Sequence, residues 1–141
     1  REIYEKKGKF SDKGREDLKI YEAAIKEIME ITMTAFVTQD IELATYVEPL
    51  EEVIDRLDDE VKKSHIKRLR EGKCTIEQGF VLSDISNNFE RIADHCSNIA
   101  VCLIQTKEEG FETHEYLDNL KVDNPDFKQK YQTFRKKYKI Q

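Results

Sequence analysis

The chain has 141 residues, enough for one ordinary domain with its own core, and 38% of them are charged. Its three cysteines include no CxxC pair, which excludes a disulfide framework and a zinc knuckle. The longest stretch without Asp, Glu, Lys or Arg, residues 95–106, has twelve residues and is too short to span a bilayer. The cysteine usage makes a reducing compartment the expected location. Because the chain begins with Arg1 and shows no signal peptide, we expect it to be a piece of a longer protein or a processed chain.

Charge is unevenly distributed along the chain. Residues 126–141 carry a net charge of +5, whereas nine carboxylates against one arginine give residues 40–60 a net charge of −8. An acidic surface of this kind repels nucleic acid and attracts cations or a basic partner. We therefore expect no nucleic-acid partner.

Three long segments predict helices. Apolar residues recur three and four positions apart in each, and with five Gly and two Pro the chain lacks the turn residues typical of an all-β protein. The stripes are formed by Leu18, Tyr21, Ile25, Ile28, Thr32, Ala35 and Gln39; by Leu43, Val47, Leu50, Ile54, Leu57 and Val61; and by Ile85, Phe89, Ile92, Cys96, Ile99 and Leu103. Helices of about 28 residues joined by short turns predict an all-α fold, an antiparallel three-helix bundle about 40 Å long.

Candidate N-caps mark where the first two helices begin. Ser11 precedes the first helix and Asp40 the second, and both residue types accept hydrogen bonds from a first helical turn. Pro49 lies inside the second stripe and predicts a kink there. The alternative is a new helix with Glu48 as an imperfect cap. We favour the kink because the apolar stripe continues through it.

A short turn is predicted between the second and third helices. Gly72 is placed to end the second helix, because a glycine in the left-handed conformation often follows a helix C-terminus. Thr75 and Gln78 have the spacing of a capping box, which would start the third helix.

The long apolar stripes end before Gly110, and a different sequence pattern follows. A short helix is predicted over residues 112–121, and Asn124 followed by Pro125 is typical of the start of a last helix. Opposite its basic residues this helix carries an aromatic stripe: Phe127, Tyr131, Phe134 and Tyr138. We expect the stripe to pack on the bundle and leave the lysines in water. A helix on an anionic membrane surface and a helix docked on the acidic segment 48–58 are the alternatives.

Carboxylates at helical spacing form two acidic stripes. Glu90 and Asp94, four residues apart, share the outward side of the third helix with Asn87 and Asn98. The second helix carries a counterpart in Glu48, Glu51, Asp55 and Asp58. Oxygen ligands spaced in this way suit hard or borderline cations such as Fe, Mn, Mg or Ca. On spacing alone, a solvated acidic helix face is the favoured interpretation.

Motifs typical of enzymes are missing from the sequence. No histidine follows a Glu by three positions, which disfavours a carboxylate di-iron enzyme, and no Walker-type phosphate loop occurs. Cys96 lies on the apolar stripe of the third helix, where an inert buried thiol is expected. The positions of Cys74 and Cys102 in the sequence indicate no particular role. We expect His65 and His95 to be structural. The chain is therefore not expected to be an enzyme.

One stretch resembles a known family. Residues 87–100, NNFERIADHCSNIA, resemble the signature helix of PhoU-type phosphate regulators, which reads Glu-Arg-Ile-x-Asp-His and then Asn-Ile-Ala. Residues 51–55 resemble the acidic motif of the same family on the preceding helix, and residues 65–69 followed by Gly72 resemble its exit and turn. The resemblance covers about residues 11–107.

The resemblance implies a metal site. In that family a Glu/Asp-x-x-x-Asp motif on each of two adjacent helices binds metal, often iron clusters, on the outside of a three-helix bundle. This sequence supplies Glu51 with Asp55 and Glu90 with Asp94. We therefore expect these four residues to hold iron or another divalent or trivalent metal ion.

One departure from the family pattern bears on function. Free-standing PhoU proteins are similar to two such bundles in tandem, whereas a single bundle resembles the cytosolic C-terminal domain of bacterial sodium/phosphate cotransporter-family proteins. Residues 4–8 and 111–141 resemble the lead-in and the tail of those domains.

The single bundle implies a regulatory domain at the inner face of the cell membrane, modulating phosphate transport or homeostasis. Its expected partners are a membrane-embedded phosphate transporter in the same polypeptide and a second copy in a homodimer. The alternatives are a free-standing adaptor of an ABC phosphate importer and its sensor kinase, a metal-dependent phosphoesterase, or a structural dimerisation bundle. We thus expect a linker over residues 1–10, a PhoU-like three-helix bundle over 11–107, and a C-terminal extension over 108–141 with a short helix and a basic amphipathic helix.

Overall fold

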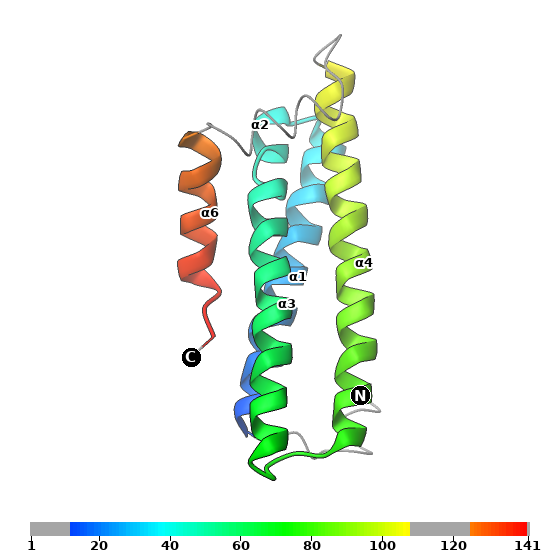
Figure 1. Ribbon diagram of the computed structural model, residues 1–141. Coiled ribbons are helices and arrows are strands. Elements are labelled where there is room, and N and C mark those ends of the chain that lie inside the picture. Colours follow the sequence, from blue (N-terminus) through cyan, green and yellow to red (C-terminus); the bar gives the residue numbers. More distant parts are fainter. Residues whose placement is uncertain (1–11, 108–124, 141) are drawn as a thin grey trace.

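The computed structural model describes residues 12–107 and 125–140, and over these residues the only regular elements are helices. They are α1 (Asp12–Thr38), α2 (Ile41–Ala44), α3 (Val47–Arg70), α4 (Ile76–Lys107) and α6 (Pro125–Lys137). The helices α1, α3 and α4 run up, down and up as a bundle, and α6 lies along α3 on the side away from α4 (Figure 1). The predicted all-α bundle is confirmed.

Four predictions fall outside the part of the chain that the structure describes: the linker over residues 1–10, the N-cap at Ser11, the short helix over residues 112–121 and the cap at Asn124. Within the described ranges, no helix combines the length and the apolar character that crossing a membrane requires.

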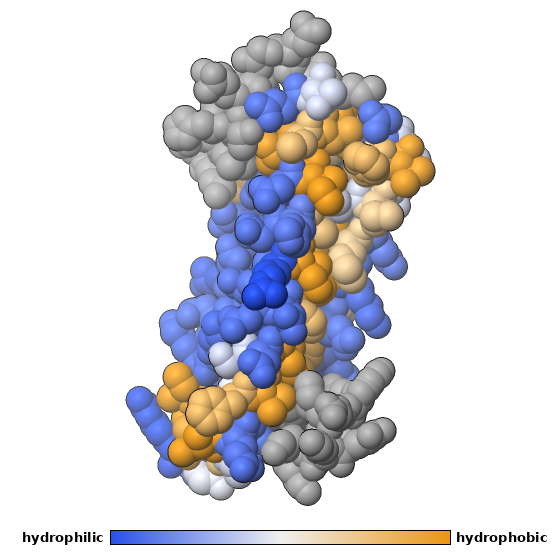
Figure 2. Space-filling model, turned by 90° about the vertical axis from the view of Figure 1, so that its right-hand side faces the viewer, coloured by the Kyte–Doolittle hydropathy of each residue, from blue (hydrophilic) through white to orange (hydrophobic). Residues whose placement is uncertain are grey.

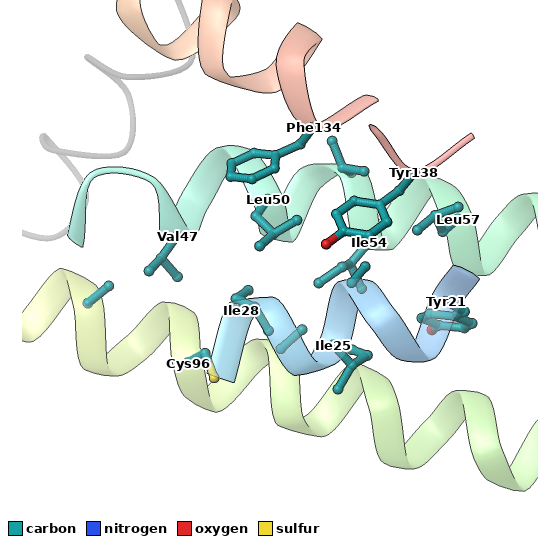
Figure 3. Packing of buried hydrophobic residues seen from close by; sticks show 14 of the residues in the cluster. Tyr21, Ile25, Ile28, Val47, Leu50, Ile54, Leu57, Cys96, Phe134 and Tyr138 are labelled. Atoms are coloured by element: carbon teal, nitrogen blue, oxygen red, sulfur yellow. The ribbon is translucent and has the colours of Figure 1, made fainter. Parts of the chain in front are cut away.

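The core lies between α1, α3 and α4 and continues beneath α6 (Figure 3). The predicted stripes of α1 and α3 supply its most deeply buried large side chains, each at most 2% exposed: Tyr21, Ile25, Ile28, Leu50, Ile54 and Leu57. Burial of a large apolar side chain contributes about 1.5–3 kcal/mol, so these two stripes dominate the stabilisation of the bundle.

The buried face of α4 is rotated relative to its predicted stripe. Its buried positions include Leu82, Ser86, Ala93, Cys96, Ala100 and Leu103. Ile99, predicted to be buried, is 40% exposed, and Ile85 and Ile92 are half-buried. The stripe was predicted from hydrophobicity alone, whereas close packing against two helices favours small side chains at the points of nearest approach. The isoleucines consequently lie at the edge of α4.

The second predicted helix is interrupted before Pro49 rather than kinked at it. α2 ends at Ala44, and α3 begins at Val47 with Tyr46 as its N-cap residue. The preference for a kink was therefore wrong, and so was Glu48 as the alternative cap. In the first turn of α3, Pro49 breaks no helical hydrogen bond, because the N–H groups there have no partner within the helix.

The other predicted helix boundaries are confirmed. The Asp40 carboxylate accepts the N–H of Leu43 at 3.1 Å and caps α2. Gly72 follows the C-terminus of α3 with a φ of +74°, the left-handed conformation that glycine adopts without strain. In the capping box the Gln78 N–H donates to Thr75 Oγ1 at 3.2 Å, and the Thr75 N–H donates to Gln78 Oε1 at 3.0 Å.

The last helix, α6, packs on the bundle through the predicted aromatic stripe, with Phe127 and Phe134 buried in the helix and Tyr138 buried just after it. The expectation that its lysines stay in water was wrong for Lys130, which is buried and contacts Thr45 and the ring of Tyr46.

At the C-terminal end of α6, Arg135 pairs with Glu60 of α3, and Lys137 Nζ lies 2.9 Å from the Glu27 carboxylate of α1. α6 therefore lies against α3, as the docking alternative has it, but these two ion pairs are made with Glu60 and Glu27 and not with the acidic stripe from Glu48 to Asp58. The apolar face that would enter a membrane surface is packed inside the protein.

Candidate metal centre in an acidic groove

Carboxylates of α3 and α4 gather along the outer junction of the two helices, and we name this set of side chains the acidic groove. We define it by seven carboxylates at helical spacing: Glu48, Glu51, Glu52, Asp55 and Asp58 of α3, and Glu90 and Asp94 of α4. Steps of three and four residues keep each set on one side of its helix. The two predicted acidic stripes therefore face each other across a single helix junction.

Three contacts between the helices fix the register of the groove. They are Glu48 with Ser97, Asp55 with Glu90, and Asp58 with Ser86. Because α3 and α4 are antiparallel, residue numbers rise along α3 as they fall along α4. This register brings Glu51 level with Asp94, one helical turn from the central contact.

The central contact of the groove joins two carboxyl groups. Asp55 is exposed as a whole residue, but its carboxyl group is hydrogen-bonded to that of Glu90. Burial of the carboxyl group, and then the negative charges of Glu90 and Glu52, raise the pKa of Asp55 to about 6. Below about pH 6 the two carboxyl groups can share a proton, and above that pH their negative charges face each other.

The upper part of the groove gathers three carboxylates of α3. Oxygen atoms of Glu48, Glu51 and Glu52 lie within 4.8 Å of one another, a spacing that could hold a metal ion. Glu48 is 4% exposed, and its carboxylate accepts a hydrogen bond from Ser97 of α4. Three carboxylate oxygens at this spacing are a donor set that a hard cation accepts.

The inner wall of the groove is held by Asp58. Its carboxylate is buried and accepts hydrogen bonds from Tyr21 Oη of α1 at 2.9 Å and from Ser86 of α4. On the solvent side, Lys62 Nζ lies 3.0 Å away. Burial, and then the charge of Asp58, raise the pKa of Tyr21 far above its usual range, so the hydroxyl remains a hydrogen-bond donor. This network ties all three bundle helices together behind the groove.

The structure brings together only some of the predicted metal ligands. Asp55 and Glu90 are in contact, and Glu51 belongs to the three-carboxylate group. Asp94 is exposed, and its place in the groove rests on the helix register alone. Asn98 lies apart from the groove, because it lines a hollow between α1 and α4.

Sequence reasoning missed the residues that complete the groove. Glu52 lies at the edge of the α3 stripe, and its charge acts on Asp55. Ser86 and Ser97 are the hydroxyl partners of the buried carboxylates. Their spacing was the available signal. Ser86 lies four residues before Glu90 and Ser97 seven residues after it, which places both on the same side of the helix as Glu90.

The remaining polar candidates fit structural roles. His65 is 6% exposed, its Nδ1 lies 3.5 Å from Cys74 Sγ, and burial, followed by the charge of Arg68, lowers its pKa. A side chain at Gly79 would place its Cβ only 3.0 Å from His65 Nε2, so α4 passes this ring closely. Cys96 is buried, and burial raises the pKa of its thiol, as expected for an inert core cysteine.

Fold and groove together define a class, an antiparallel three-helix bundle with carboxylates facing each other across two adjacent helices. The PhoU domain family model matches residues 20–103, more than half of the chain. The chain therefore belongs to the PhoU domain family.

A relative in Thermotoga maritima, named "Phosphate-specific transport system accessory protein PhoU homolog 1", is 29% identical to this chain over 91 residues. These residues make up 64% of this chain and 39% of the relative, so the chain spans about two fifths of the relative's length. No solved structure matches the chain.

Proposed function

We propose that this chain is a regulatory domain that modulates phosphate transport, and that its acidic groove binds a multivalent metal ion. The contact between Asp55 and Glu90 carries the metal proposal, because it joins one residue of each predicted acidic motif across the helix junction. Membership of the PhoU domain family and the name of the Thermotoga maritima relative supply the connection with phosphate transport.

The donor set fits such an ion. All seven groups of the acidic groove are carboxylates, the ligands that hard and borderline cations such as iron or manganese prefer. Asp55 and Glu90 would hold the ion between the helices in place of their shared proton, and Glu51 and Asp94 are level with each other one turn further along. When bound, the metal supplies positive charge that offsets the repulsion between the carboxylates and cross-links α3 to α4.

For the setting in which the domain acts, we propose the cytosolic side of a sodium/phosphate cotransporter-family protein, with the membrane-embedded part in the same polypeptide. The resemblance of residues 111–141 to the tails of those proteins supports this setting. A free-standing adaptor of an ABC phosphate importer and its sensor kinase is the second candidate. The words "transport system accessory protein" in the relative's name favour it. In both settings the role is regulatory rather than catalytic.

Elemental analysis tests the metal proposal. The chain is purified without added metal or chelator, beside the variant Asp55→Asn/Glu90→Gln. We expect a transition metal in near-stoichiometric amount in the native chain and its loss from the variant, because the amides remove the two anionic ligands that face each other. Asp59→Asn/Asp84→Asn is the matched control, since it removes one exposed carboxylate from each of the same two helices outside the defined groove.

The regulatory part is tested with the full-length gene in cells. Phosphate uptake is measured over a range of external phosphate for the native gene, the groove variant and the control variant. We expect the groove variant alone to change the dependence of uptake on phosphate supply. Equal metal content in all three proteins contradicts the metal site, and unchanged uptake despite metal loss contradicts its regulatory use.

A further inference from the structure

A cavity between α6 and the bundle is not used by the proposed function, and we call it the α6 cavity. Its volume of about 540 Å³ lies within the range of about 300–1,000 Å³ that is typical of small-molecule sites. Its lining residues come from α1, α2, α6 and the start of α3, and none of them belongs to the acidic groove. Figure 2 shows the molecule from the side opposite α6, where hydrophilic surface runs beside apolar surface, so a ligand in the α6 cavity would leave that side unchanged.

The two walls of the α6 cavity differ in polarity. The helix α6 contributes polar and charged residues at helical spacing, which share one face: Asp126, Gln129, Lys130, Thr133 and Lys137. The bundle contributes an apolar wall formed by Ile31 of α1, Leu43 of α2 and Tyr46 at the start of α3. A ligand held between these walls needs polar groups toward α6 and an apolar or aromatic surface toward the bundle.

One end of the α6 cavity holds a buried cation, Lys130, whose side chain is 8% exposed. Its Nζ donates to Thr45 Oγ1 at 2.7 Å and to the Asp126 carboxylate at 2.6 Å, and it lies 4.3 Å from the centre of the Tyr46 ring. Thr45 and Tyr46 hold the ammonium group in place, whereas the Asp126 side chain is 61% exposed and can return to water at little cost. The Asp126 carboxylate thus occupies the position at which an anionic group of a ligand would bind, close to the N-terminus of α6, where the helix dipole also favours negative charge.

The other end of the α6 cavity is polar as well. Lys137 Nζ lies 2.9 Å from the Glu27 carboxylate, which also accepts a hydrogen bond from Tyr138. Lys130 and Lys137 are seven residues apart, or about 10 Å along the helix. The apolar end of a lipid chain would meet charged groups here, which is unfavourable. The dimensions instead suit a ligand with an anionic group at one end, polar groups at the other and a flat apolar part between them.

We infer that the α6 cavity binds a nucleotide, with the phosphate at Lys130 and the base toward Glu27. The phosphate replaces the Asp126 carboxylate at the ammonium group, and the flat ring of the base lies along the apolar wall beside Tyr46. An amino group of the base donates to the Glu27 carboxylate at the far end. The site shares no residue with the acidic groove, so the nucleotide site and the metal site can fail independently of each other.

Isothermal titration calorimetry of the full 141-residue chain tests this inference. Adenosine monophosphate, adenosine and inorganic phosphate are titrated separately in the presence of a chelator, so that metal in the acidic groove does not contribute. We expect one molecule of adenosine monophosphate to bind per chain, at least about tenfold more tightly than either adenosine or phosphate. Each of these smaller probes satisfies only one part of the cavity, because adenosine lacks the anion and phosphate lacks the ring.

Two substitutions in the α6 cavity should change the affinity in opposite directions. Lys130→Met keeps the apolar stem but removes the cation, and should weaken binding of adenosine monophosphate at least about tenfold. Asp126→Asn removes the carboxylate that competes with the phosphate, and should tighten binding about two- to fivefold. Lys136→Met is the matched control, because Lys136 is an exposed cation of the same helix that does not line the cavity, and it should change the affinity by less than about twofold. Circular dichroism reports whether each variant is folded.

Three outcomes would overturn the inference. The first is a native chain that binds no adenosine monophosphate up to about 1 mM. The second is phosphate binding as tightly as adenosine monophosphate, which would make the cavity a simple anion site. The third is an equal loss of affinity in Lys130→Met and Lys136→Met, which would mean that the general charge of α6 attracts the nucleotide. If Lys130→Met fails to fold, Asp126→Asn decides, since an affinity that does not rise in this variant contradicts a phosphate at Lys130.

Discussion

The two edges of α4 have opposite chemistry. At its junction with α3, carboxylates are partly withdrawn from water and bonded to each other or to serine hydroxyls, as between Asp55 and Glu90. At its junction with α1, apolar side chains such as Met33 and Phe36 are exposed instead. The first edge therefore concentrates negative charge, and the second exposes apolar surface to water. Each edge favours a different kind of contact.

Both edges follow from the small side chains on the buried face of α4. Ser86, Ala93 and Ala100 are among its most deeply buried residues. The longer side chains of α4 lie to either side of this face, Glu90 toward α3 and Ile99 toward α1. The packing of α4 inside the bundle therefore places carboxylates at one edge and exposed apolar side chains at the other.

The largest effect is expected behind the acidic groove. Asp58→Ala removes the acceptor that Tyr21 and Ser86 share inside the protein. Buried donors left without a partner should lower the free energy of unfolding by about 2–4 kcal/mol. Urea denaturation in the presence of a chelator measures this change without a contribution from bound metal.

The neighbouring carboxylate Asp59 provides the comparison for that experiment. Its side chain is 64% exposed and pairs only with Lys63 among the ion pairs that the structure describes. Asp59→Ala should therefore stay within about 0.5 kcal/mol of the native chain. Equal losses for Asp58→Ala and Asp59→Ala would show that the Asp58 network does not stabilise the bundle.

Metal binding should depend on pH in the range where Asp55 titrates. A cation competes with the proton at Asp55, whose pKa is raised to about 6, so affinity should rise with pH until that proton is gone. Calorimetric titration with Mn²⁺ should show up to about a tenfold gain in affinity from pH 5 to pH 6 and little change above pH 7. An affinity that is flat across this range would place the metal elsewhere.

Sequence patterns predicted the parts of the molecule that depend on local spacing. The capping box at Thr75, the turn at Gly72 and both acidic stripes require only neighbouring residues, and the structure contains them. The break before Pro49 and the exposure of Ile99 were missed, because packing between helices decides where a helix restarts and which side it buries. Periodicity placed the acidic stripes on their helices. The direct contact between Asp55 and Glu90 could not be predicted in this way, because it depends on how α3 and α4 are aligned along their length.

A smaller effect is expected from Asp55 in the absence of metal. Its pKa is raised from about 4 in the unfolded chain to about 6 in the folded protein, so the folded state binds the proton more tightly. The contribution of this carboxyl group is therefore most favourable below pH 4 and is lost as pH rises through 6. Asp55→Asn should stabilise the metal-free chain at pH 8 by less than about 1 kcal/mol, because the residue is partly solvated, and should have no such effect at pH 4. Urea denaturation at the two pH values distinguishes these cases, and equal effects at both would contradict the assignment.

The smallest effect on the fold is expected at Met33, whose side chain is 61% exposed on α1. Met33→Glu should change the free energy of unfolding by no more than about 0.5 kcal/mol, because the substitution removes little buried contact from the bundle. Urea denaturation beside Asp58→Ala compares this exposed position with a buried one. A loss as large as that of Asp58→Ala would mean that Met33 supports the bundle itself, and the exposed apolar side chains at the junction of α1 and α4 would then serve the fold.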